Sequence, residues 1–199
     1  MITLAFDTCL DKMYAVLKKD GVVLESKIIE NHDNKYHSAF LISTLKEIMK
    51  KNCIKPQNID LIGVNIGPGS STGIRACVTV ARVMAQQINC KVAGVSSLEI
   101  LSKAYGKNAL VALDARKNSA YLYMDGEIKG AVPLEEIPKD EYNVLTDDKL
   151  QPILGGESYQ KLVLPLGETL ADLAEQKALK DDCNWRLVKP LYIQPPPMG

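Results

Sequence analysis

Two aspartates that each follow a predicted strand are the clearest candidates for catalytic or metal-binding residues in this sequence. Asp7 ends the apolar run 2–6, and Asp114 ends the apolar run 109–113. Carboxylates at such positions can hold a metal ion beside a phosphate, which would suit an actin-like ATPase or small kinase that binds ATP-Mg on its own. However, the segment after Asp7 lacks the glycine that phosphate-binding loops usually carry. The alternative is that both aspartates accept hydrogen bonds from nearby backbone N–H groups.

The glycine-rich segment 67–73 is the second candidate for binding chemistry. Gly67, Gly69 and Gly73 permit backbone conformations that other residues resist, and the segment opens a helix whose free N–H groups could bind an anion. Its spacing matches neither GxxxxGK[ST] nor GxGxxG, so the sequence favours a tight structural turn. Gly155 and Gly156 weakly resemble an adenosine-binding glycine pair and belong to the same alternative hypothesis.

A catalytic or metal-binding set is hard to assemble from the remaining residues. The two histidines, His32 and His37, do not have HExxH spacing, and the serines of GPGSS are not in a GxSxG elbow. The five cysteines are Cys9, Cys53, Cys77, Cys90 and Cys183; they form no CxxC pair, which indicates reduced thiols. We therefore expect no catalytic residues, no metal and no cofactor.

The balance of charge argues against direct binding of nucleic acid. Basic and acidic residues number 24 each, whereas phosphate neutralisation needs a surplus of lysine and arginine. An RNA-binding module is thus a weaker hypothesis, and any RNA would be reached through a partner.

The N-terminal MITLAFDTCL has no basic segment, and no apolar run approaches the roughly 20 residues of a membrane helix. We expect a cytoplasmic protein with no membrane contact.

The order of the predicted elements indicates an α/β protein with two lobes. Strands over 2–6, 13–17 and 22–29, with Asp20-Gly21 as a hairpin turn, form an antiparallel meander. A similar series of strand, aspartate, strand, DG turn and strand recurs from residue 109. This layout is typical of the actin-like ATPase or ribonuclease-H-like fold, with an N-terminal lobe over 1–101 and a smaller C-terminal lobe over 102–199. The other predicted elements are helices over 38–51, 70–88, 98–105 and 166–179, strands over 61–66, 92–95, 120–124, 127–131, 142–146 and 153–154, and an extended tail over 189–199.

The predicted helix 70–88 carries more apolar surface than one sheet can cover. One stripe contains Ile74, Cys77, Val78, Ala81, Ala85 and Ile88, and a second contains Ala76, Val80 and Val83. A helix that rests on a sheet needs only one apolar face. The second stripe either packs inside the monomer or contacts another subunit, with Arg75, Thr79 and Arg82 near the rim.

Six segments, in one order along nearly the whole chain, resemble the TsaB (YeaZ) family. GPGSSTGIR resembles the family's GPGSFTGLR, and GVSSLEIL, ALDARKNSAY, AFDTC, His37-Ser38 and PLYIQP resemble its other conserved segments. The residues that carry this resemblance are Asp7, His37, Gly67, Gly69, Gly73, Arg75, Ser97, Glu99, Asp114 and Arg116. Ser71 departs from the family's Phe and Gln194 from its common Arg, and the C-terminal half is short.

The resemblance implies an actin-like fold without the metal and catalytic residues of TsaD. It implies a non-catalytic scaffold that pairs with a TsaD-type catalytic subunit, with a TsaE-type ATPase joining them, and that reaches tRNA only indirectly. The assembly would transfer a threonylcarbamoyl group to an adenosine beside the anticodon. A helix-bundle interface is implied, and we assign to it Phe40, Arg75, Ala76, Thr79, Val80, Arg82 and Val83; two copies would pair through it when the partner is missing.

Overall fold

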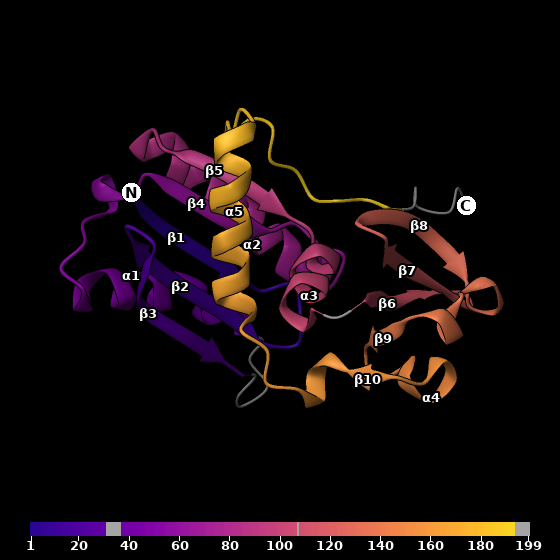
Figure 1. The fold of residues 1–199 in the computed structure, drawn as a ribbon. Coiled ribbons are helices and arrows are strands. Elements are labelled where there is room, and N and C mark those ends of the chain that lie inside the picture. The colour runs from indigo at the N-terminus through magenta and orange to yellow at the C-terminus, as the bar shows by residue number, and fades with distance from the viewer. Residues whose placement is uncertain (31–36, 107, 194–199) are drawn as a thin grey trace. The chain divides into compact units, whose positions relative to one another are not determined.

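The computed structural model describes residues 1–30, 37–106 and 108–193, in two units (Figure 1). One unit comprises 1–97 together with 166–190, and the other comprises 98–165 with 191–199. This division differs from the expected lobes of 1–101 and 102–199, because the segment 166–190 groups with the N-terminal part of the chain. His32 and Gln194 lie outside the described residues.

The first unit is built on a five-stranded sheet in the order β3-β2-β1-β4-β5. Its strands are β1 (Ile2–Asp7), β2 (Met13–Lys19), β3 (Val22–Ile29), β4 (Leu61–Asn65) and β5 (Lys91–Val95). The predicted meander is confirmed, because β1, β2 and β3 pair antiparallel, whereas β4 and β5 continue the sheet in parallel. Asp20 and Gly21 have φ values of 49° and 81°, the positive angles that a type I′ turn requires.

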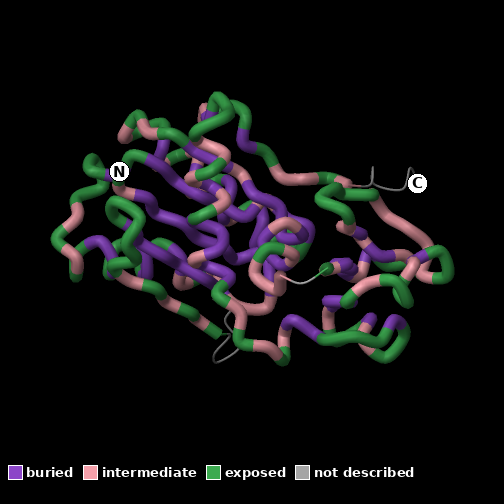
Figure 2. The backbone as a smooth tube through the Cα atoms, viewed as in Figure 1, coloured by how far each residue is buried: buried purple, intermediate pink, exposed green. Residues whose placement is uncertain are grey.

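Helices cover both faces of this sheet. A 3-10 turn (His37–Phe40) leads into α1 (Leu41–Lys51), and α1 and α2 (Ser71–Ile88) lie on one face. The helix α5 (Leu166–Lys180) crosses the other face (Figure 1). The buried residues between the sheet and α1 and α2 include Leu4, Phe6, Met13, Leu45, Ile48, Ile62, Val64, Cys77 and Ala81. Figure 2 shows that β1, β2 and β4 are mostly buried, whereas the outer strand β3 is exposed or half-buried along its length.

Small residues allow α5 to lie close to the sheet. A Cβ atom added at Gly63 would come within 2.8 Å of the Ala174 Cβ, and one at Gly167 within 2.7 Å of Val16. A side chain at either position would push the helix outward. This long-range fit explains why 166–190 belongs to the first unit.

A buried ammonium group also holds α5. The Lys18 side chain is only 5% exposed, and its Nζ donates to Asp172 Oδ1 at 2.5 Å and to Glu175 Oε2 at 2.9 Å. Burial by itself would lower the pKa of Lys18, but the hydrogen bonds to the two carboxylates raise it above its ordinary value. The charge is therefore retained and fastens the helix to β2.

The second unit repeats the same topology on a smaller scale. Its five-stranded sheet runs β10-β9-β6-β7-β8, with β6, β7 and β8 as an antiparallel meander and β9 and β10 added in parallel. The strands are β6 (Ala109–Arg116), β7 (Ser119–Met124), β8 (Glu127–Pro133), β9 (Asn143–Thr146) and β10 (Glu157–Ser158), and the helices are α3 (Ser97–Tyr105) and α4 (Gln151–Leu154). Short 3-10 turns occur in this unit at Leu134–Glu136, Lys139–Glu141 and Tyr159–Lys161, and in the first unit at Pro56–Asn58.

The strand predicted over 153–154 is wrong, because these residues end the short helix α4. Pro152 occupies the first turn of that helix, where its fixed φ and missing N–H are tolerated.

Among the described residues, no helix is both long and apolar enough to cross a membrane.

The Lys18 cluster yields an asymmetric prediction for stability. Replacing both acceptors, as D172N/E175Q, leaves a buried ammonium without a charged partner and should lower the free energy of unfolding by about 2–3 kcal/mol. The K18M variant should lose less of the free energy of unfolding. Its apolar side chain of similar length still packs in the same place, and Asp172 is half-exposed to water. Urea unfolding of both variants measures the difference; an equal or larger loss in K18M would contradict this account.

Candidate partner-binding surface

The helix α2 begins where a tight loop packs against the end of β1. Ser70 caps the helix, with its Oγ accepting a hydrogen bond from Gly73 N at 3.3 Å, and Ser70 N donates to Cys9 O at 2.8 Å. At the other end Asn89 adopts the left-handed conformation with φ 55°. Both signals are typical of helix ends, so the sequence fixes the limits of α2 locally.

The glycines of the 67–73 loop permit a close backbone-to-backbone contact. A Cβ atom added at Gly73 would lie 1.8 Å from Thr8 O, and one at Gly69 would lie 2.3 Å from Cys9 O. Gly67 has φ 102°, which other residues rarely adopt. The predicted tight structural turn is confirmed, because the chain's own 8–9 backbone lies against the start of the helix.

A buried hydrogen-bond network, which we call the Asn65 network, joins several of the segments that resemble family motifs. Asn65 Nδ2 donates to Asp7 Oδ2 at 2.9 Å, and Asn65 Oδ1 accepts from Gly67 N at 2.8 Å and from Ser97 Oγ at 2.9 Å. Asp7 Oδ1 accepts from Cys9 N at 2.6 Å. The ends of β1 and β4, the glycine loop and the start of α3 are thereby tied to one amide side chain. Sequence reasoning missed Asn65, because a single polar residue at a strand end matches no motif.

Asp7, Cys9 and Cys77 lie close enough to form a metal site, but their chemistry favours hydrogen bonding. One ligand atom from each lies within 4.8 Å of the others, and all three residues are buried. Burial, followed by the neighbouring Cys77 and Asp7, raises the pKa of the Cys9 thiol well above its ordinary value. Cys77 Sγ also lies 3.0 Å from Thr8 N, which donates to it, so these atoms act as parts of the fold.

Asp114 lies two residues before the end of β6 in the second unit, separately from the Asn65 network. Its Oδ1 accepts from Arg116 N at 2.8 Å, and its Oδ2 lies 3.2 Å from Lys149 Nζ. The hypothesis that both aspartates accept backbone hydrogen bonds is thus confirmed. Arg116 itself is exposed. It begins a run of three residues with positive φ in the turn between β6 and β7.

Glu99, on α3, is half-buried. The pKa of Tyr123 is raised mainly by burial of its phenol and further by the charge of Glu99.

The second unit contains a cleft beside the Gly155-Gly156 pair. The cleft has a volume of about 700 Å³ and is bordered by Tyr105, Lys139 and Glu157, among others. The Tyr105 hydroxyl donates to Glu157 Oε2. Gly156 is required by the fold, because an added Cβ would lie 2.3 Å from Val144 O, whereas nothing lies within 4 Å of such an atom at Gly155.

The surface of α2 that faces away from the sheet retains apolar side chains. Val83 is 52% exposed, and Ala76 and Val80 are only partly buried. The first apolar stripe of α2 is buried against the sheet at Ile74, Cys77, Val78, Ala81 and Ala85. Arg75 and Thr79 are exposed beside the second stripe. Val80 packs partly against the core of the first unit, whereas Val83 is left exposed, so this chain covers the second stripe only in part.

Helix α1 and the turn before it extend this surface. Phe40 ends the turn and packs partly against the core, the turn contacts α2, and Ile42 of α1 is 49% exposed. Arg82 is engaged within the chain, because its guanidinium lies 5.8 Å from the ring centre of Trp185. The local pattern gave no indication of this contact with Trp185, since the two residues are far apart in the sequence.

Comparison with known proteins identifies relatives. The family model described as TsaD, tRNA N6-adenosine threonylcarbamoyltransferase, matches residues 24–145. The tRNA threonylcarbamoyladenosine biosynthesis protein TsaB of Bacillus subtilis is 29% identical over 163 residues, which cover 77% of this chain and 69% of that protein. The protein of the same name from Buchnera aphidicola (subspecies Schizaphis graminum) is 26% identical, over 60% of this chain and 58% of its own length.

Solved structures share the fold. YeaZ from Pseudomonas aeruginosa superposes with a TM-score of 0.73 at 22% identity, covering 96% of this chain and 99% of that one. An uncharacterised P. aeruginosa protein with similarity to peptidase YeaZ gives a TM-score of 0.76 at 21% identity, over 97% and 99% of the two chains. The predicted actin-like, ribonuclease-H-like α/β fold is confirmed.

The Asn65 network predicts that one amide makes a large contribution to stability. The N65A variant leaves Asp7, Gly67 N and Ser97 without this partner in a buried setting, so the free energy of unfolding should fall by about 2–4 kcal/mol. Asn58 is an exposed control, whose Oδ1 accepts a hydrogen bond from Lys55 N in a short turn. Denaturant unfolding should show a loss of about 1 kcal/mol or less for N58A. Equal losses in the two variants would refute the role of the network.

Proposed function

The chain belongs to the TsaB (YeaZ) family, and on this basis we propose that it is a non-catalytic scaffold subunit of the complex that forms N6-threonylcarbamoyladenosine in tRNA. It pairs with a TsaD-type catalytic subunit and supplies no catalytic residue. A TsaE-type ATPase joins the pair, tRNA is reached through these partners, and the assembly works in the cytoplasm. Without the partner, two copies pair through the same surface.

One observation carries this proposal, the outward apolar stripe of α2. Ala76, Val80 and Val83 follow one another at i, i+4 and i+7, and Val83 remains half-exposed although the opposite face of the helix is buried. Apolar side chains surrounded by polar ones on a helix suit a helix–helix interface. Phe40 and Ile42 extend the apolar area, and Arg75 and Thr79 lie at its rim. Arg82, stacked on Trp185, would reach the rim through its exposed part.

Substitution of Val83 tests the interface. The V83E variant places a carboxylate in the apolar centre of the proposed contact, so affinity for the TsaD-type protein of the same organism should fall about 100-fold. The folded monomer should be unaffected, because this side chain is half-exposed. Calorimetry or light scattering of the mixed proteins measures the loss.

The matched control is L179E, which changes an exposed leucine on α5, the helix on the opposite face of the sheet. It should bind the partner with unchanged affinity. Unchanged binding of V83E, or equal losses in the two variants, would contradict the proposed surface.

The rival hypothesis is an actin-like ATPase or small kinase that binds ATP-Mg by itself. It draws on Asp7, Asp114 and the two glycine segments, 67–73 and the Gly155-Gly156 pair, the second of which borders the cleft of the second unit. Both carboxylate oxygens of Asp7 already accept hydrogen bonds inside the fold, which leaves them little capacity for a metal ion. Calorimetry of the chain alone with ATP and magnesium should show no heat of binding. Saturable binding that is lost in D114N would favour the rival.

A further inference from the structure

The outer strand of the first sheet, β3, presents an unpaired edge. It is the terminal strand in the order β3-β2-β1-β4-β5, and no described segment hydrogen-bonds to its outer side. Several of its apolar side chains are exposed, namely Val22 at 64%, Val23 at 42%, Leu24 at 39% and Ile28 at 55%. An exposed apolar edge strand is a template for pairing with another strand.

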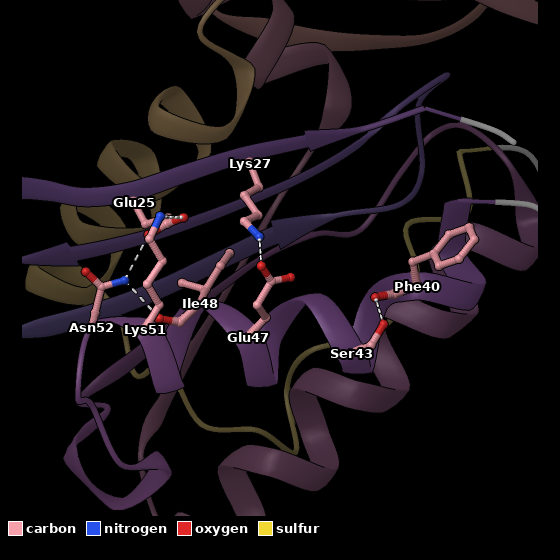
Figure 3. A network of polar contacts seen from close by, with 8 residues as sticks. All are labelled: Glu25, Lys27, Phe40, Ser43, Glu47, Ile48, Lys51 and Asn52. Carbon is pink, nitrogen blue, oxygen red and sulfur yellow. Dashed lines mark hydrogen bonds and ion pairs between the residues drawn. The ribbon is translucent and has the colours of Figure 1, made fainter.

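The two sides of this strand differ in character. On the side of α1, Glu25 accepts hydrogen bonds from Lys51 Nζ at 2.8 Å and from Asn52 at 3.1 Å, and Lys27 is paired with Glu47 (Figure 3). On the side of α5, Ile28 stands opposite Tyr14 in the ladder, next to the helix. The charged side chains are thus held in fixed positions along one side of the edge, and apolar side chains follow the other.

The sequence of β3 is self-complementary about Ser26. In an antiparallel pair of identical strands related by a two-fold axis at Ser26, Glu25 of each copy stands opposite Lys27 of the other, and Leu24 stands opposite Ile28. Opposite charges and apolar pairs that face each other across strands stabilise a sheet. We propose that two copies of this chain associate by antiparallel pairing of their β3 edges in this register.

Neighbouring registers are disfavoured by charge. A two-fold axis at Glu25 would set this carboxylate against its own copy, and an axis at Lys27 would set two ammonium groups together. Like charges directly opposite each other are destabilising. An axis at Leu24 or at Ile28 would place a charged residue opposite an apolar one, so only the Ser26 register satisfies both the charged and the apolar positions.

A β-bulge limits the length of the ladder. The register between β2 and β3 shifts between Leu17 and Lys18, where Glu25 and Val23 are successive partners and Leu24 is the extra residue. Bulges twist an edge away from a straight partner strand. The regular ladder about Ser26 therefore extends over 25–27, with the Leu24 and Ile28 pair at its two ends. A contact this short should be reversible, with a dissociation constant on the order of 10–100 µM.

The test separates this edge from the α2 surface. In the V83E background the helical surface is blocked, so the edge pairing is measured alone, whether or not the proposed function holds. Light scattering over a concentration series should show V83E passing from monomer to dimer, and V83E/I28K should need at least about tenfold higher concentration. The I28K change adds a charge at an exposed position, so the monomer should melt at the same temperature. A V83E protein that stays monomeric at about 200 µM, or whose dimer is insensitive to I28K, would overturn the proposal.

A charge swap provides the sharper control. In the V83E background, K27E and E25K each create like charges across the proposed two-fold axis and should weaken dimerisation about threefold to tenfold. The double variant E25K/K27E restores opposite charges between the copies and should recover most of the affinity. It does not restore the pairs with Glu47 and Lys51 inside the chain, so recovery reports on the interface alone. A double variant as weak as the single ones would overturn the register.

Discussion

The close approach of the glycine loop to the end of β1 is the constraint on which the first unit depends. At Gly73 an added Cβ would lie 1.8 Å from Thr8 O, so the first turn of α2 rests directly on backbone. The Asn65 network lies beside this contact and joins two strand ends to the loop and to Ser97. The orientation of α2 about its own axis follows from this anchoring, and so does the exposure of its second apolar stripe.

The second constraint is the filling of both faces of the first sheet. On one face the buried stripe of α2 and the residues of α1 form the core, and on the other α5 approaches closely because Gly63 and Ala174 are small. Lys18 then fixes α5 by charge. With both faces covered, the outward side of α1 and α2 and the free edge of β3 carry the apolar groups that we propose for association.

Residues that suggest catalysis in the sequence make structural contacts in the first unit. Asp7 lies at a strand end where a metal ligand is plausible, but its two oxygens accept hydrogen bonds from Cys9 N and Asn65. The glycines of the loop permit close packing, and the N-terminal end of α2 is covered by 8–9. A family motif can thus be retained because the backbone geometry demands it.

Local patterns predicted most of the elements but not their long-range partners. The meander, the two DG turns and the ends of α2 follow from alternation, turn residues and caps that act over a few positions. The position of α5 could not be predicted, because it depends on Gly63 and Lys18, more than 100 residues away from it in the sequence. The contact of Arg82 with Trp185 was missed for the same reason. Residues 153–154 were predicted as a strand because two apolar residues are too few to distinguish a strand from a short helix.

The most direct test of the scaffold account is hydrogen–deuterium exchange of the chain, alone and with the TsaD-type protein of its own organism. The account predicts slower exchange in peptides that cover 41–51 and 71–88, while peptides that cover β8 are unchanged. Complex formation with protection confined to the second unit, and none in α1 or α2, would contradict it.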